Sequence, residues 1–157
     1  VYIWEGLPDP QEGPAITLDV DEPGRLDSDG EYLVVTTTFD EIKFSIYRVA
    51  DLASNPQPYP VDNPGGFNLP MDAALAQGAL FLADTSFIRV LAWRSVEDVL
   101  AGQVADVLLG AADFHDTRPG IGPDKLFWPG ALTFDGSYLW VGEFKFSGRI
   151  VRFPVHP

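Results

Sequence analysis

The chain has 157 residues, of which 46% are hydrophobic and 21% charged, a composition typical of one folded globular domain. Its 23 acidic and 10 basic residues give a formal net charge of −13, which disfavours binding to nucleic acids and to anionic membrane surfaces. No apolar run approaches the roughly 18 residues that a transmembrane helix requires. The chain has no cysteine, which excludes disulfides and thiolate sites, is tolerated in either redox compartment and favours an extracytoplasmic location.

The N-terminal segment contains two short apolar stretches, Val1–Trp4 and Ala15–Val20. We expect them to be the last two strands of a repeat that precedes the first complete one. The chain begins without Met and without a signal-peptide pattern, so we expect it to be a processed form or part of a longer protein. The acidic residues that follow do not fit an EF-hand loop, because Pro23 stands at a ligand position.

Three segments share one pattern: a proline, an apolar alternation, a turn that ends in glycine and a second apolar run. They are Pro23–Thr38, Pro70–Thr85 and Pro129–Phe144, with turn glycines Gly30, Gly78 and Gly136. Strand-rich repeats of roughly 40–50 residues are typical of propeller blades. The second runs, YLVV, ALFLA and YLWV, are almost continuously apolar. We therefore expect these strands to be buried on both faces, between neighbouring sheets.

Each repeat continues into a third strand, expected at Ile42–Val49, Ile88–Trp93 and Arg149–Val155. A fourth is expected at Val104–Leu109 and near Tyr59–Asp62. Ser95–Gly102 begins with serine, has an acid three residues later and ends in glycine, which predicts one short helical turn. We interpret the chain as a single domain of four units, at 1–22 (partial), 23–69, 70–128 and 129–157 (incomplete).

The repeats resemble NHL repeats, which build six-bladed β-propellers. The second repeat is the most similar, with Ala83-Asp84 at the end of its second strand, followed by Arg89-Val90 and Trp93. The third has Gly142-Glu143 and Arg149-Ile150 at these positions, whereas the first departs from the pattern with Thr36 and Thr37. Ala105–Phe114 is similar to the Ala-Asp-x-x-Leu-Gly-Gln-Pro-Asp-Phe segment of bacterial members, with Ala111-Ala112 in place of Gln-Pro.

The resemblance implies an all-β fold, a β-propeller with about three four-stranded blades. That is half of a six-bladed ring, since the strands expected here amount to about half of what closure needs. Either a homodimer or the remainder of a longer chain would complete the ring. A three-bladed array alone would leave open sheet faces and edges.

Six residues are candidate ligand-binding residues: Asp84, Glu143, Asp113, His115, Asp116 and Trp128. Asp84 and Glu143 occupy equivalent strand ends, where a propeller has its rim; the alternative, which the resemblance implies, is a structural hydrogen bond to the backbone of the following turn. His115 lies between Asp113 and Asp116, either as a divalent-cation site or as a polar loop packed by Phe114. Trp128 is the aromatic residue expected to be exposed, and His156 is expected to be solvated.

No motif for a nucleophile or a phosphate-binding loop is present. The sequence therefore favours a binding or scaffold module that presents a loop-rich rim to a protein or small-molecule partner. This interpretation needs no cofactor. The alternative, drawn from the propeller resemblance, is a calcium-dependent lactonase-like hydrolase, for which the calcium-binding residues cannot be assigned from the sequence.

Overall fold

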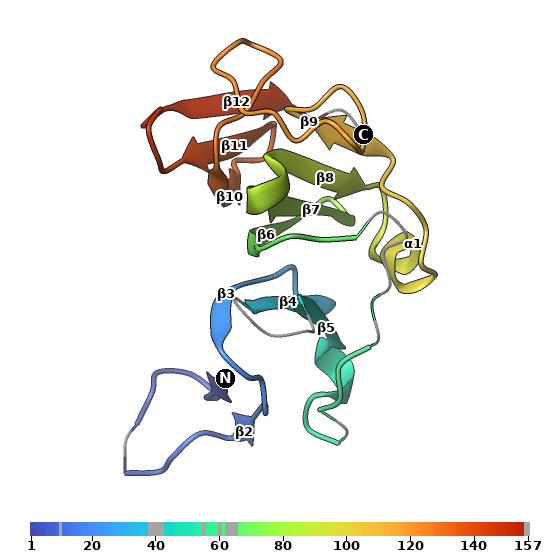
Figure 1. The fold of residues 1–157 in the computed structure, drawn as a ribbon. Coiled ribbons are helices and arrows are strands. Elements are labelled where there is room, and N and C mark those ends of the chain that lie inside the picture. Colours follow the sequence, from blue (N-terminus) through green and yellow to red (C-terminus); the bar gives the residue numbers. More distant parts are fainter. Residues whose placement is uncertain (10, 38–42, 55, 60, 62–65, 156–157) are drawn as a thin grey trace.

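The computed structural model describes residues 1–9, 11–37, 43–54, 56–59, 61 and 66–155 (Figure 1). These residues confirm the all-β class, with 42% of them in strands. Within this part of the chain there is one α-helix, α1 (Val96–Leu100), and two 3-10 turns, η1 (Val49–Asp51) and η2 (Thr85–Phe87). No helix found there has the length and apolar character needed to span a membrane.

The strands form four antiparallel sheets, and hydrogen-bonded neighbours in each sheet are consecutive in the chain. The N-terminal sheet pairs β1 (Tyr2–Ile3) with β2 (Ile16–Thr17). The next contains β3 (Pro23–Ser28), β4 (Tyr32–Thr37) and β5 (Phe44–Arg48). The central sheet contains β6 (Pro70–Ala76), β7 (Ala79–Asp84), β8 (Arg89–Trp93) and β9 (Val107–Leu109). The last contains β10 (Pro129–Phe134), β11 (Tyr138–Glu143) and β12 (Ile150–Pro154).

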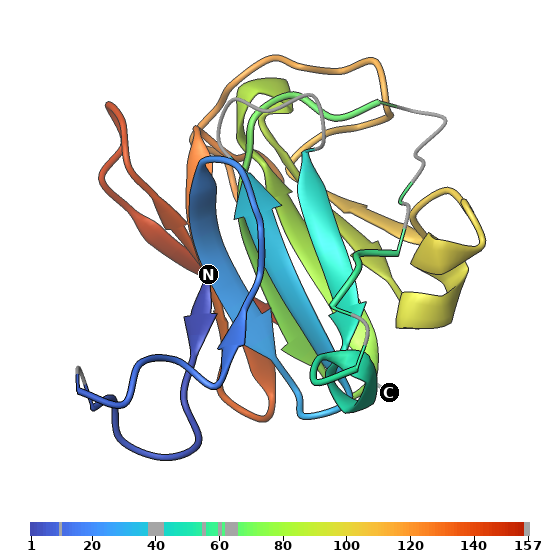
Figure 2. The same ribbon diagram turned by 90° about the horizontal axis from the view of Figure 1, so that it is seen from below.

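The three larger sheets lie one after another in chain order, and Figure 1 shows them nearly along their strands. Their first strands lie side by side, because β6 contacts both β3 and β10. The later strands of each sheet extend away from this line. In Figure 2, the hairpin turns between β3 and β4 and between β10 and β11 lie at one end of the sheets, and the long connection between β9 and β10 lies at the other.

Apolar clusters fill the spaces between successive sheets. In β4, Tyr32 and Val34 pack toward the central sheet, whereas Leu33 and Val35 pack toward the N-terminal sheet. In β7, Leu80 and Leu82 join the cluster on the β4 side, while Phe81 joins the cluster formed with the last sheet. Each fully buried Leu or Val contributes roughly 1.5–3 kcal/mol. The expected burial on both faces is thus confirmed for these two strands.

The last sheet departs from this expectation. Leu139 and Val141 of β11 are buried, but Tyr138 and Trp140 are only half-buried. Their side chains lie on the face opposite the central sheet. The prediction of burial on both faces is therefore wrong for YLWV, because within the described residues only one face of this sheet is covered by another sheet.

The hairpin turns also differ from one another. Gln77 and Gly78 both have positive φ values, 55° and 81°, as a two-residue turn of type I′ requires. In the hairpin turn of the first repeat, Gly30 has a positive φ of 92° but Asp29 does not, and the Asp29 carboxylate accepts hydrogen bonds from the amides of Glu31 and Tyr32. The turn that contains Gly30 is therefore an Asx turn, stabilised by the Asp29 side chain.

Two smaller predictions fall on described residues. The helix α1 is confirmed: the Ser95 hydroxyl accepts a hydrogen bond of 3.1 Å from the Asp98 amide, as an N-cap does. The fourth strand β9 is shorter than expected. In the preceding sheet, the fourth strand is a single bridge between Ile46 and Tyr59; Asp62, like His156, lies outside the described residues.

Candidate functional site

The structure places Asp84 in the protein interior, at the end of β7. Its carboxylate accepts hydrogen bonds from Arg89 Nε, at 2.8 Å, and from the Asn68 amide, at 2.7 Å. The Arg89 guanidinium also donates to the carbonyls of Phe114 and Gly66. Both charged side chains are 0% exposed. Through these contacts Asp84 and Arg89 hold the loops before β6 and after β9 against the end of β7. The buried Asp84 carboxylate is not accessible to a ligand.

Glu143 repeats this arrangement at the end of β11. Its carboxylate accepts from Arg149 Nε at 2.7 Å and from the Phe127 amide at 2.8 Å, and Phe127 lies 16 residues earlier, as Asn68 does from Asp84. Arg149 donates in turn to the carbonyls of Ile121 and Lys125. The repeated pair holds the loop that precedes β10. The structural reading of both acids fits these contacts, although their backbone partners precede the strand rather than follow it.

The two acids have opposite pKa shifts. Burial raises the pKa of Asp84 to about 6, although the Asn68 amide and the Arg89 charge partly offset this effect. Burial also acts to raise the pKa of Glu143, but hydrogen bonds from Arg149, Ser147 and the Phe127 amide outweigh it, and the pKa is lowered. Both carboxyl groups are therefore mainly ionised at neutral pH.

The proposed cation site in the loop after β9 is not assembled. The Asp116 carboxylate accepts from Arg118 Nε at 2.8 Å and from Lys125 Nζ at 2.6 Å, and these two contacts lower its pKa. The Asp113 carboxylate accepts from the amides of His115 and Asp116. Within the described contacts, the exposed His115 imidazole reaches neither carboxylate. These residues therefore match the polar-loop reading.

Trp128 is half-buried rather than exposed. Its ring meets Phe144 edge-on at a centroid distance of 5.7 Å, and Lys145 Nζ lies 4.5 Å from the ring centre. The residue has a positive φ of 52° immediately before Pro129, as Leu69 does before Pro70. Trp128 thus packs at the start of β10. Lys145 covers one face of its ring, so this face is not free for stacking.

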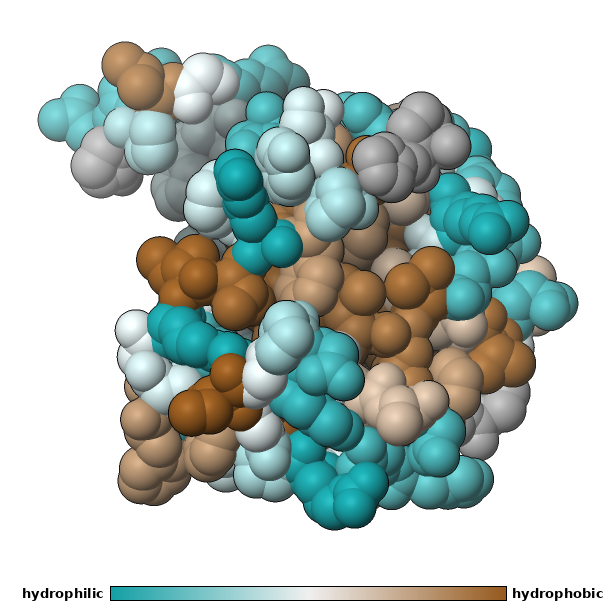
Figure 3. Space-filling view, turned by 90° about the horizontal axis from the view of Figure 1, so that it is seen from above, coloured by the Kyte–Doolittle hydropathy of each residue, from teal (hydrophilic) through white to brown (hydrophobic). Residues whose placement is uncertain are grey.

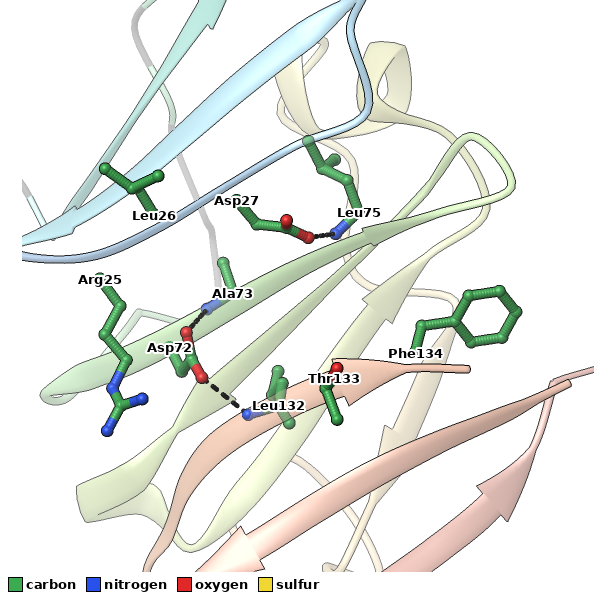
Figure 4. A pocket seen from close by; sticks show the side chains of 9 residues that line it. All are labelled: Arg25, Leu26, Asp27, Asp72, Ala73, Leu75, Leu132, Thr133 and Phe134. Carbon is green, nitrogen blue, oxygen red and sulfur yellow. Dashed lines mark hydrogen bonds between the residues drawn. The ribbon is translucent and has the colours of Figure 1, made fainter. Parts of the chain in front are cut away.

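A groove of about 440 Å³ lies where β3, β6 and β10 meet, and Figure 4 shows its lining. Each strand supplies three residues: Arg25, Leu26 and Asp27 from β3, Asp72, Ala73 and Leu75 from β6, and Leu132, Thr133 and Phe134 from β10. All three are edge strands, so one side of each backbone has no partner within its own sheet. The groove therefore combines side chains with free strand edges from three sheets.

Two carboxylates join these edges. Asp27 accepts from the Leu75 amide at 2.8 Å, and Asp72 accepts from the Leu132 amide at 2.7 Å (Figure 4). Each bond satisfies an edge N–H group whose burial without a partner would cost about 1–3 kcal/mol. Asp72 is 6% exposed, and burial raises its pKa, with the Leu132 amide and the Arg25 charge acting in the opposite direction.

Arg25 supplies the positive charge of the groove. Its exposed guanidinium makes no hydrogen bond or ion pair with any residue that the structure describes, although its charge acts on Asp72. The sequence reasoning missed this group. Arg25 and Asp72 each follow the repeat proline by two residues, so aligning the repeats on Pro23 and Pro70 would have placed them together.

Asp27 and Asp72 are the carboxylates of the groove that could meet a cation. Among the described residues, no group of three or more His, Asp or Glu side chains is arranged to hold a metal ion. No family model matches the chain, and no curated protein matches it.

Proposed function

We propose that this chain is a binding module built from about three blades of an NHL-type β-propeller, half of a six-bladed ring. The consecutive antiparallel strands of each sheet and the burial of β4 and β7 between sheets support this architecture. The side-by-side first strands support it as well, because β6 contacts both β3 and β10, as the innermost strands of neighbouring blades do in a propeller. A second copy or further chain completes the ring.

The ligand site of this module is the groove between the three first strands. The observation that carries the proposal is the Arg25 guanidinium, which faces a groove of about 440 Å³ with unused donors. Ligand pockets typically measure roughly 300–1,000 Å³. A guanidinium pairs best with a carboxylate or a phosphate, through two parallel hydrogen bonds.

The two aspartates define the rest of the ligand. Asp27 and Asp72 each accept backbone hydrogen bonds, and an ionised carboxylate has about four acceptor positions, so both keep capacity for a donor. A small zwitterion fits this charge distribution, with its carboxylate on Arg25 and its ammonium group facing Asp27 and Asp72. Such a ligand is neutral overall, so the net charge of −13 does not repel it.

The test is a binding screen of free amino acids and betaines by ligand-observed NMR, followed by calorimetry. We expect saturable binding that Arg25→Gln weakens at least about tenfold, the equivalent of about 1.4 kcal/mol. Arg94→Gln is the matched control, because Arg94 is exposed and lies outside the groove. Binding that Arg25→Gln leaves unchanged, or no binding at millimolar concentrations, would reject the proposal.

The calcium-dependent hydrolase makes a different prediction for the same groove. Calcium requires six to eight oxygen ligands, to which Asp27 and Asp72 would contribute. In that case calcium would raise the melting temperature, and a chelator would abolish lactone hydrolysis. If calcium changes neither property and the zwitterion binds, the binding module is the function that remains.

A further inference from the structure

Two exposed hairpin turns carry the same Asp-Gly sequence. Asp29-Gly30 follows β3, Asp135-Gly136 follows β10, and the chain has no other Asp-Gly pair and no Asn-Gly pair. Gly30 and Gly136 have φ values of 92° and 101°, and a Cβ placed on either glycine would have no neighbour within 4 Å. Because glycine leaves its own backbone nitrogen open to approach, an Asp-Gly pair readily closes to a cyclic imide, which reopens as isoaspartate.

Both aspartates hold one carboxylate oxygen in the same way. Asp29 Oδ1 accepts from the amide of Glu31 at 2.9 Å and from that of Tyr32 at 2.8 Å. Asp135 Oδ1 accepts from the second and third amides after it at the same two distances. These bonds fold the side chain back along the chain, so the carboxyl carbon lies beside the intervening glycine nitrogen. Two N–H groups thus stabilise the oxyanion that forms when this nitrogen adds to the carboxyl carbon.

The second carboxylate oxygen distinguishes the two turns. Asp135 Oδ2 accepts a hydrogen bond of 2.7 Å from the Trp140 indole, and this bond is the largest cause of the lowered pKa of Asp135. Asp29 Oδ2 has no hydrogen-bond partner among the described residues. Trp140 is half-buried on the outer face of the last sheet, the side that Figure 3 views, where hydrophobic and hydrophilic side chains adjoin.

The glycine nitrogens differ as well. The Gly30 amide donates a hydrogen bond of 3.2 Å to the Ser28 hydroxyl, which itself donates to the Tyr32 carbonyl at 2.7 Å. A lone pair of the hydroxyl therefore faces the Gly30 N–H and draws its proton away from the nitrogen. In the last sheet Phe134 directly precedes the aspartate and has no hydroxyl to offer. The first turn thus combines a polarised nitrogen with an unbonded leaving oxygen.

We propose that Asp29 is a site of spontaneous isomerisation to isoaspartate and that the Trp140 contact protects Asp135 from the same reaction. The Gly30 nitrogen bonds to Cγ of the protonated Asp29 carboxyl and loses its proton. The Oδ2 hydroxyl takes up that proton and leaves as water, which closes a succinimide. Water then adds to the backbone carbonyl of Asp29 and breaks its bond to the Gly30 nitrogen, so the backbone continues through Cγ.

The Trp140 indole slows this sequence at its first requirement. A hydrogen bond donated to Oδ2 stabilises the ionised carboxylate, whereas the leaving oxygen has to carry a proton. The modified turn lies next to the groove, because Asp27, two residues earlier, lines it and accepts from the Leu75 amide. The site goes beyond the proposed binding function and does not depend on it.

The test is to age the full chain under mildly acidic conditions and to measure isoaspartate at each turn. Trypsin places the two sites in separate peptides, 26–43 and 126–145. Labelling with a protein isoaspartyl methyltransferase quantifies the product, and electron-transfer fragmentation locates it. We expect isoaspartate to accumulate several-fold faster at Asp29 than at Asp135. Equal rates, or a faster reaction at Asp135, would overturn the proposal.

Three variants separate the causes. Trp140→Phe keeps a ring but removes the indole N–H, and it is expected to raise the rate at Asp135 several-fold without changing the rate at Asp29. Ser28→Ala is expected to slow the reaction at Asp29 alone. Asp29→Glu cannot close the five-membered ring and is expected to clear the signal from peptide 26–43. A signal that persists there would assign the product to another aspartate and reject the site, and an unchanged rate at Asp135 in Trp140→Phe would reject the protection.

Discussion

Two acid–arginine pairs occupy the same place in consecutive sheets, yet their surroundings differ. In the central sheet, Asp84 and Arg89 are both 0% exposed; in the last sheet, the Arg149 side chain that holds Glu143 is 23% exposed. Arg89 also lies 4.8 Å from the Phe87 ring centre, so aromatic rings as well as backbone carbonyls surround it. The same local contacts therefore produce a sealed pair in one sheet and a partly solvated pair in the other.

The difference comes from what each sheet has on either side. The central sheet lies between two others, whereas the last sheet is covered on one face only within the described residues. Burial away from solvent raises the pKa of Asp84 to about 6. At Glu143, hydrogen bonds to the carboxylate outweigh burial and lower the pKa. Position in the stack of sheets, rather than the residue pair itself, decides how much each interaction stabilises the fold.

The largest effect is expected from Asp84→Ala. It leaves the Arg89 charge buried without a counter-charge, which typically costs about 3–5 kcal/mol. Urea unfolding measures this loss. The double variant Asp84→Leu with Arg89→Met removes both charges and is expected to recover a large part of the stability. If Asp84→Ala lowers the free energy of unfolding by less than about 1 kcal/mol, the pair is not buried away from solvent as described.

The second expected effect is that Asp84 and Glu143 change the stability of the fold with pH in opposite directions. The folded pKa of Asp84, about 6, lies above the unfolded value of about 3.9. Because the folded state binds this proton more tightly than the unfolded state, the titration of Asp84 favours folding below about pH 4, and this contribution is lost as the pH rises through 6. Glu143 has the opposite sign: its contribution is present above its unfolded pKa and is lost as the pH falls through its lowered folded pKa.

Carboxyl-carbon NMR measures both titrations in one sample. We expect a midpoint near 6 for Asp84 and one below the ordinary glutamate value for Glu143. Asp84→Asn is the control, because it removes only the upper transition. Coinciding midpoints for the two acids would contradict the contrast between the sheets.

Glu143→Ala is expected to cost less than Asp84→Ala, about 1–2 kcal/mol. Water can solvate the partly exposed Arg149 once its partner is removed, so no fully buried charge remains. The same urea experiment measures this value. A cost as large as that of Asp84→Ala would mean that the last sheet is covered on its outer face in solution.

The smallest effect is expected at the surface. Glu31 and Arg48 form an ion pair of 3.6 Å, with side chains that are 65% and 39% exposed. Glu31→Ala is expected to change the free energy of unfolding by less than about 0.5 kcal/mol. A larger loss in 0.5 M salt than in low salt would be inconsistent with a solvent-screened pair.

The sequence was sufficient where local patterns decide the structure. Continuous apolar runs predicted the buried strands β4 and β7, and Ser95 with Asp98 predicted the start of α1. The prediction of burial on both faces failed for β11, because the apolar pattern of YLWV does not depend on whether another sheet covers its second face. Burial on both faces depends on neighbours far along the chain, which a local pattern does not contain.

The candidate site was harder to predict for the same reason. The acids at positions 84 and 143 stand out at strand ends, but their arginine partners became evident only from the geometry. His115 drew attention because of its sequence neighbours, whereas the Asp116 carboxylate binds Arg118 and the more distant Lys125. Arg25 and Asp72 are 47 residues apart in the numbering, and only the side-by-side packing of β3 and β6 brings them into one groove.

Hydrogen exchange at the Leu132 amide tests the central claim, that the first strands of the three sheets meet and line one groove. This amide donates to Asp72 of the neighbouring sheet, as Leu75 donates to Asp27. We expect slow exchange at both amides, with Asp72→Ala accelerating Leu132 alone and Asp27→Ala accelerating Leu75 alone. Rapid exchange of Leu132 in the unaltered chain, or exchange that Asp72→Ala does not change, would contradict the account.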